Sequence, residues 1–267
     1  MQSSNPVLTR LGEAARQERA GSAGYPTGQG YGIAPPDSRS RMMTLDDVVV
    51  RTVALLAITG VAGAISWVML PASSPAVLLL AVIGSSLAGL VLGLVISFAR
   101  ITNPFVIGAY AVIEGVLLGV VSRFFEERFS GIVIQAVVGT FGVFAIMAVL
   151  YKLKVLRATP RFTRGVIGAL IGVVILGFVN WISALLGHNL GLVEYSVDGK
   201  VGWLPIVFSL VCIVVGALTF ILDFDAVEQG VRYGLPERYA WYCAFGLLVG
   251  LIFLYWQILR LLSYLRR

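Results

Sequence analysis

Seven stretches of about twenty almost uncharged residues limit what this chain can fold into. They cover approximately residues 48–70, 76–99, 104–125, 131–151, 165–187, 201–222 and 239–262. A helix of about 20 apolar residues is long enough to cross the ~30 Å hydrocarbon layer of a bilayer. The whole chain has a mean hydropathy of +0.90, with 58% hydrophobic and only 13% charged residues. The sequence therefore predicts an all-α, polytopic membrane protein with seven transmembrane helices.

Polar residues and prolines mark where these helices are expected to begin. Thr44 is placed to cap the first helix, and Asp47 suits the positive end of its dipole. Ser74-Pro75 and Asn103-Pro104 each combine a capping residue with a proline at the first helical position. Arg51 lies one turn inside the first helix, from where its side chain can extend to the membrane surface.

Residues 1–43 differ in composition from the rest of the chain. They are rich in Gly, Ser, Pro and Tyr and contain no apolar core. Such a segment cannot bury enough apolar area to offset its ordering entropy, so we expect a disordered cytoplasmic tail followed by a transmembrane domain at 44–267. The tail also lacks a signal peptide, and the first spanning helix is expected to direct insertion.

Basic residues predict the orientation in the membrane. Most of the 20 Lys and Arg residues, including those of the loop at 152–164, fall on the same side as the N-terminus. Because cytoplasmic loops carry the excess of Lys and Arg, we expect a multi-pass protein of the cell membrane with its N-terminus inside and its C-terminus outside.

The residues needed for common enzymatic sites are absent from the sequence. The single histidine, His188, lies in a predicted loop, and no HExxH, GxSxG or Walker pattern occurs. Cys212 and Cys243 both fall in apolar runs and predict unpaired thiols rather than a disulfide or metal pair. The scattered basic residues do not favour nucleic-acid binding. We expect neither an enzyme nor a bound cofactor.

Pairs of glycines one turn apart recur in four of the predicted helices. Small residues at this spacing let helix backbones approach closely in membranes. The sequence therefore predicts tight packing at four pairs: Gly89 and Gly93, Gly115 and Gly119, Gly168 and Gly172, and Gly246 and Gly250.

Glu114 is the acidic residue that lies deepest in a predicted helix, near the middle of the third. A charged side chain at the bilayer centre costs about 2.5–3.5 kcal/mol on insertion scales, so such residues usually face the bundle interior and serve a function. We expect Glu114 to lie on an ion or proton path. The alternative is a structural role, with a neutral carboxyl hydrogen-bonded to a neighbouring helix, for which Asn180 is the candidate partner.

Three more acids follow the sixth apolar run, in a segment short enough to be a loop. If the helix continues through it, Asp225 and Glu228 share a face, whereas Asp223 and Asp225 are about 200° apart. At most one of the two aspartates then points into the bundle. Solvated acids at a helix end are the alternative, with Glu228 and Arg232 forming an ordinary i,i+4 pair.

Several segments resemble one family of membrane proteins. They are Met43-Thr-Leu-Asp-Asp47, Tyr110-Ala-Val-Ile-Glu-Gly115, Leu222-Asp-Phe-Asp225, Tyr239-Ala-Trp-Tyr-Cys243 and Leu254-Tyr-Trp-Gln-Ile-Leu-Arg-Leu-Leu262. Together they are similar to the Bax inhibitor-1 family, the transmembrane Bax-inhibitor-motif proteins, and look most like its bacterial branch. The resemblance covers about residues 42–265.

The resemblance implies seven helices with the last one central, ringed by the others. It also implies a pH-sensitive calcium leak controlled by paired aspartates on the sixth and seventh helices. The first aspartate corresponds to Asp225, with Asp223 as the alternative. The second has no acidic counterpart, because the two possible alignments place Val249 or Gln257 at its position.

The leading functional expectation is therefore passive permeation of cations, with Ca²⁺ as the permeant ion. Ca²⁺ prefers several oxygen ligands, which Asp225, or Asp223 as its alternative, and nearby carbonyls can supply, with Glu114 deeper in the bundle. The alternative is a non-conducting regulator that binds other membrane proteins, such as a quality-control protease. Apart from such proteins, the lipid bilayer is the only expected partner.

The orientation can be tested by accessibility labelling in intact cells. A tag after Arg267 should be reached by a reagent that does not cross the membrane, whereas a tag inserted near Arg157 should be protected. Labelling that places both positions on one side would contradict the predicted seven spans.

Overall fold

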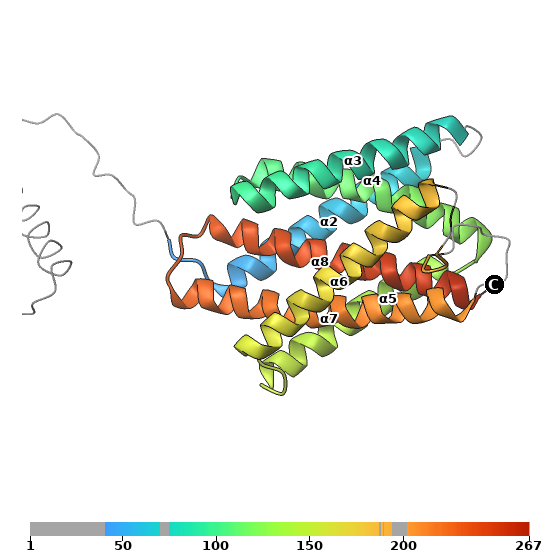
Figure 1. Cartoon of the computed structure of the whole chain (residues 1–267). Coiled ribbons are helices and arrows are strands. Elements are labelled where there is room, and N and C mark those ends of the chain that lie inside the picture. Colours follow the sequence, from blue (N-terminus) through green and yellow to red (C-terminus); the bar gives the residue numbers. More distant parts are fainter. Residues whose placement is uncertain (1–40, 70–74, 187, 189, 194–201, 267) are drawn as a thin grey trace, which may run out of the picture. The chain divides into compact units, whose positions relative to one another are not determined.

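The computed structural model describes residues 41–69, 75–186, 188, 190–193 and 202–266. These residues contain seven long helices, each apolar enough to cross a membrane (Figure 1). The all-α prediction is confirmed, and the chain is a multi-pass membrane protein. The helices are α2 (Leu45–Met69), α3 (Pro75–Ala99), α4 (Pro104–Arg128), α5 (Ile132–Lys152), α6 (Pro160–Leu185), α7 (Trp203–Arg232) and α8 (Tyr239–Leu265). The predicted tail lies almost wholly outside the described residues.

The predicted caps at Thr44 and Asn103 are confirmed. Thr44 Oγ1 accepts a hydrogen bond from Asp47 N at 3.2 Å, and Asp47 Oδ2 accepts one from Thr44 N at 3.0 Å, which forms a reciprocal cap. Asn103 Oδ1 accepts from Phe105 N at 2.9 Å. Thr159 caps α6 in the same way, so this helix starts at Pro160, earlier than predicted. Ser74 lies outside the described residues.

The largest error in the predicted boundaries concerns α7. The predicted span ended at residue 222 and left open whether Asp223, Asp225 and Glu228 follow in a loop or in helix, and the helix continues to Arg232. Glycine and proline are absent between 217 and 229, and Ala226, Glu228 and Gln229 are good helix formers, so nothing in this stretch stops the helix. The acids therefore occupy the last turns of α7.

The last helix lies at the centre, as the resemblance implies. α8 packs against α2, α4, α5 and α7. Among the described helices, the backbone of α3 lies close to that of α4, and the backbone of α6 lies close to that of α7. The Tyr242 hydroxyl of α8 also reaches α3, where it donates to the Ser97 carbonyl at 3.3 Å. The ring around α8 is thus made of four helices, and α3 and α6 lie outside it.

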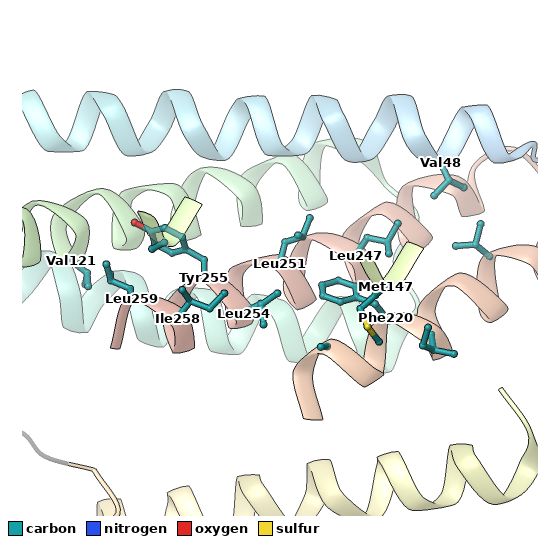
Figure 2. Close-up of a cluster of buried hydrophobic side chains, with 14 of the residues drawn as sticks. Val48, Val121, Met147, Phe220, Leu247, Leu251, Leu254, Tyr255, Ile258 and Leu259 are labelled. Atoms are coloured by element: carbon teal, nitrogen blue, oxygen red, sulfur yellow. The ribbon is translucent and has the colours of Figure 1, made fainter. Parts of the chain in front are cut away.

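A continuous cluster of buried side chains joins α8 to its neighbours. Figure 2 shows this cluster, in which α8 is the largest contributor. Its members include Val48 of α2, Val121 of α4, Met147 of α5, Phe220 of α7, and Leu247, Leu251, Leu254, Tyr255, Ile258 and Leu259 of α8. Burial of α8 on several sides explains why its sequence is apolar on more than one face.

Two of the four predicted glycine pairs bring helices into close contact. A methyl group added at Gly115 would lie 2.5 Å from the Thr59 carbonyl oxygen of α2, and one at Gly119 would overlap the Gly63 carbonyl. On the other side of α4, Gly89 of α3 packs against Glu114 and Gly93 packs against Tyr110. These contacts confirm the prediction for α3 and α4.

The prediction is wrong for α6 and partly wrong for α8. Nothing lies within 4 Å of a methyl group added at Gly168, Gly172 or Gly246, whereas one at Gly250 would meet the ring of Phe220. The spacing of glycines indicates which helices can approach closely, but the order in which helices pack decides which ones do. Because α6 contacts only α7, its glycine pair is left without a neighbour.

Gly119→Ala should destabilise the bundle, because the added methyl group meets backbone that cannot move without shifting α2. We expect a loss of about 1–3 kcal/mol, measured as a lower unfolding midpoint of the purified protein. Gly108→Ala in the same helix is the matched control, since nothing lies within 4 Å there. Equal midpoints for the two variants would contradict close α2–α4 packing.

Candidate functional site

The acids at the end of α7 point in two directions. Asp223 lies on the same face of α7 as Gly216 and Phe220, at helical spacing. This face packs on α8, where Gly216 meets Phe253 and Phe220 meets Gly250. Asp225 and Glu228 both interact with Tyr151 of α5. The geometric expectation that only one aspartate points into the bundle is confirmed, and that aspartate is Asp223.

Asp225 and Glu228 form a polar cluster with side chains around them. Tyr151 donates its hydroxyl hydrogen to Glu228 Oε2 at 2.5 Å, and Arg232 Nη2 lies 2.6 Å from Glu228 Oε1. Gln229 Nε2 donates to Asp225 Oδ2 at 2.5 Å. The predicted Glu228–Arg232 pair is therefore present. No sequence pattern pointed to Tyr151, because only the packing of α5 on α7 brings it to the acids.

Asp223 differs from these acids in having no such partner. Its side chain is half-buried between α7 and α8, close enough to the Cys243 thiol for direct electrostatic interaction. Among the described residues it has neither a hydrogen-bond nor an ion-pair partner. A half-buried carboxylate without a partner is costly in a membrane protein and is therefore a candidate for function.

Glu114 lies on the other side of the bundle. Its carboxyl packs against Gly89 of α3 and hydrogen-bonds to the Tyr110 phenol one turn earlier in α4. Asn180, the suggested partner, is fully buried on α6, which packs on α7. The structure does not bring Glu114 and Asn180 together.

The described residues contain no group of three or more His, Cys, Asp or Glu side chains that could hold a metal ion. Asp225 and Glu228 supply two carboxylates to this end of α7, fewer than such a group would need. Cys212 and Cys243 are unpaired thiols, as predicted.

A second polar layer lies further along the interface of α7 and α8. Gln257 is 7% exposed and Ser209 is 1% exposed. Within the described part of the chain, neither Gln257 Oε1 nor Ser209 Oγ has a hydrogen-bond partner. Leaving a buried polar group unsatisfied costs about 1–3 kcal/mol. Gln257 follows Gly250 and Phe253 at helical spacing, so it shares the α8 face that packs on α7.

A clamp holds the end of the bundle near these acids. Arg51 Nη2 lies 2.6 Å from Glu237 Oε1, Nη1 donates to the Glu237 carbonyl at 2.8 Å, and the guanidinium lies over the Trp241 ring. The residues just before α2 pair with the α7–α8 loop, through Met43 N to Leu235 O and Glu237 N to Arg41 O, both at 2.8 Å. We call this the Arg51 end.

The clamp changes the interpretation of the N-terminal segment and of Arg51. Residues 41–43, which the sequence placed with the tail, belong to the folded bundle. The Arg51 side chain, only 14% exposed, reaches Glu237 in the loop before α8. Its partner is 186 residues away in the chain, and no local pattern could have revealed it.

Comparison with known proteins identifies the family. A family model described as Bax inhibitor 1 like matches residues 5–267. The chain belongs to the Bax inhibitor 1-like family. No curated protein matches it.

In this Bax inhibitor 1-like protein, the structure separates the two positions proposed for a second acid. Val249 is 37% exposed on the outside of α8, whereas Gln257 is buried on the face toward α7. Position 257 is therefore the one that faces the same interface as Asp223. A neutral amide stands there, so Asp223 is the one carboxylate between α7 and α8 among the residues that the structure describes.

The Arg51 clamp should contribute measurably to stability. Arg51→Gln removes two charge-assisted hydrogen bonds from a shielded guanidinium, and we expect a loss of about 1–3 kcal/mol in thermal unfolding. Arg232→Gln is the control, because it breaks an exposed pair worth about 0–1 kcal/mol. A larger effect at Arg232 than at Arg51 would contradict the clamp.

Proposed function

We propose that this Bax inhibitor 1-like protein is a passive cation leak of the cell membrane, with Ca²⁺ as the permeant ion. It acts without a catalytic residue or bound cofactor, and its N-terminus is cytoplasmic and its C-terminus outside. The observation that carries the proposal is Asp223, a half-buried carboxylate with no partner in the described residues, on the face of α7 that packs against the central helix.

The proposed path begins at the Arg51 end. Asp225 and Glu228 attract cations to the mouth beside Tyr151, where water still screens their charge. Asp223 lies further in along α7, where a carboxylate interacts more strongly with a cation because the local dielectric is lower. Cations thus meet a shallow acidic cluster first and a deeper single carboxylate second.

Beyond Asp223, two aromatic rings separate it from the second polar layer. Phe220 fills the space left by Gly250, and Phe253 fills the space left by Gly216. Gln257 and Ser209 follow along the same interface. Two polar layers with an apolar constriction between them are the arrangement expected of a closed, hydrophobically gated path. Opening would require the rings to leave these glycine positions.

Weak ion binding suits a leak. Ca²⁺ takes six to eight oxygen ligands when it is held firmly, but one carboxylate with carbonyls and water holds it only briefly. Conduction needs sites that an ion can enter and also leave. The lack of a three-residue metal cluster among the described side chains is compatible with passage and argues against Ca²⁺ storage.

Flux into liposomes that hold the purified chain and a Ca²⁺-sensitive dye tests the proposal. Asp223→Asn should lower Ca²⁺ flux about tenfold, because it removes the one shielded charge on the path. Asp225→Asn should have a smaller effect, because Asp225 lies at the mouth and is already bonded to Gln229.

Glu114→Gln is the matched control, because it also neutralises an acid within a helix. Its carboxyl faces α3, away from α7 and α8, so we expect its flux to equal that of the unchanged protein. A drop in Glu114→Gln with no change in Asp223→Asn would move the path to the α3–α4 side. Flux no greater than that of empty liposomes would end the leak proposal.

The alternative, a regulator that binds other membrane proteins, is favoured by one observation. Gly165 and Gly168 of α6 are exposed, and nothing lies within 4 Å of a methyl group added at either of them or at Gly172. Small residues on an outward helix face allow close approach of a helix from another protein. Absence of flux, together with preserved folding, would leave this regulator as the better proposal.

A further inference from the structure

A cavity of about 340 Å³ lies on the face of α8 away from α7. Its walls come from α2 on one side and α5 on the other, and its floor comes from α4 and α8. None of the acids discussed above lines it. The lining residues that matter here are Thr59, Gly60 and Ala64 of α2, Ser122 of α4, Phe141 of α5 and Tyr255 of α8.

The cavity is a groove that opens sideways between α2 and α5. These two helices do not contact each other within the described structure. Gly60, Ala64 and Phe141 line the cavity and are also exposed, whereas Ser122 and Tyr255 at its floor are buried. Because α2 and α5 are membrane-spanning helices, the opening faces the hydrocarbon layer, and hydrocarbon chains have direct access to it.

The hydroxyl groups in the groove are already hydrogen-bonded. Thr59 donates its hydroxyl hydrogen to the Leu55 carbonyl at 2.9 Å, and Thr140 donates to the Ala136 carbonyl at 2.8 Å. The hydroxyls of Ser122 and Tyr255 bond to each other at 2.7 Å. No charged side chain lines the groove. The surface offered to an occupant is therefore apolar, which favours hydrocarbon over a polar ligand.

Size favours a single hydrocarbon chain over a protein helix. A cavity of about 150 Å³ holds benzene, so this groove has room for about a dozen carbon atoms. A helix is about 10 Å wide with its side chains, so a partner helix would lie across the opening, whereas an unbranched chain can enter the space behind it.

One end of the groove lies near the membrane surface. Trp67, which lines the groove, is in the last turn of α2, and Arg123 Nη1 donates to the Trp67 carbonyl at 2.8 Å. Tryptophan is enriched at the level of lipid headgroups. We call this the Arg123 end, opposite to the Arg51 end.

From these observations we propose that the groove between α2 and α5 is a lipid site. It binds one acyl chain of a phospholipid from the leaflet at the Arg123 end, with the headgroup beside Trp67. The chain lies against Gly60 and Ala64 and reaches Tyr255 at the floor.

Native mass spectrometry of the full chain, extracted in mild detergent from phosphatidylcholine nanodiscs, tests the proposal. The unchanged protein should retain one phospholipid. Gly60→Phe and Ala64→Phe fill the groove, and the fraction of protein that retains phospholipid should fall about tenfold. Nothing lies within 4 Å of a methyl group at Gly60, so the substitution should not disturb α2. Gly168→Phe, an equally open site on α6, is the control and should retain the lipid.

A second measurement separates lost binding from lost folding. Adding phosphatidylcholine should raise the unfolding midpoint of the unchanged protein and of Gly168→Phe, but not of a folded groove variant. If Gly60→Phe does not fold, Ala64→Phe carries the test. Equal lipid retention by groove variants and control would overturn the proposal. A dimer that Gly60→Phe abolishes would also overturn it, since a second copy would then occupy the groove.

Discussion

Close backbone contact between α2 and α4 is the interaction on which most of this structure depends. Lipid tails are as apolar as leucine, so the hydrophobic effect does not drive helices together inside a bilayer. Gly115 and Gly119 let α4 lie directly on the backbone of α2 around Gly63. This contact sets the position of Ser122 against Tyr255 on the central helix, and it leaves α5 on the far side of the groove.

The scarcity of charge makes the placement of each acid informative. Glu126 accepts hydrogen bonds from the backbone at the start of α5, Glu237 bonds to Arg51, and Glu228 bonds to Tyr151 and Arg232. For these three acids, the bonds that they form are enough to explain why an acid stands at that position. Asp223 has no such reason within the described structure, and the two unsatisfied oxygens of Ser209 and Gln257 lie along the same interface. The interface of α7 and α8 thus concentrates polar groups that packing alone does not explain.

The helices could be predicted from the sequence, but most of their contacts could not. Apolar runs and caps such as Thr44 and Asn103 act locally, because backbone groups in hydrocarbon must bond within their own helix. Asp225 was assigned as the inward aspartate because of a family resemblance. In the structure Asp223 is the inward one, because its face of α7 packs on α8. The same holds for Gly168 and Gly172, whose spacing is suitable for packing, yet α6 has only α7 as a neighbour. Tertiary neighbours, not local pattern, decided each of these cases.

The clamp between the beginning of α2 and the loop before α8 has a consequence for how the chain is made. Proteins are synthesised from the N-terminus, so α2 leaves the ribosome long before Glu237, which lies 186 residues after Arg51. Until then the Arg51 guanidinium must find water or lipid phosphate, and the backbone of residues 41–43 lacks the loop between α7 and α8 to which it hydrogen-bonds. The bundle can therefore be closed only after its last loop has been translated. A chain released early would keep an open, charged end that the cell's quality-control machinery could recognise.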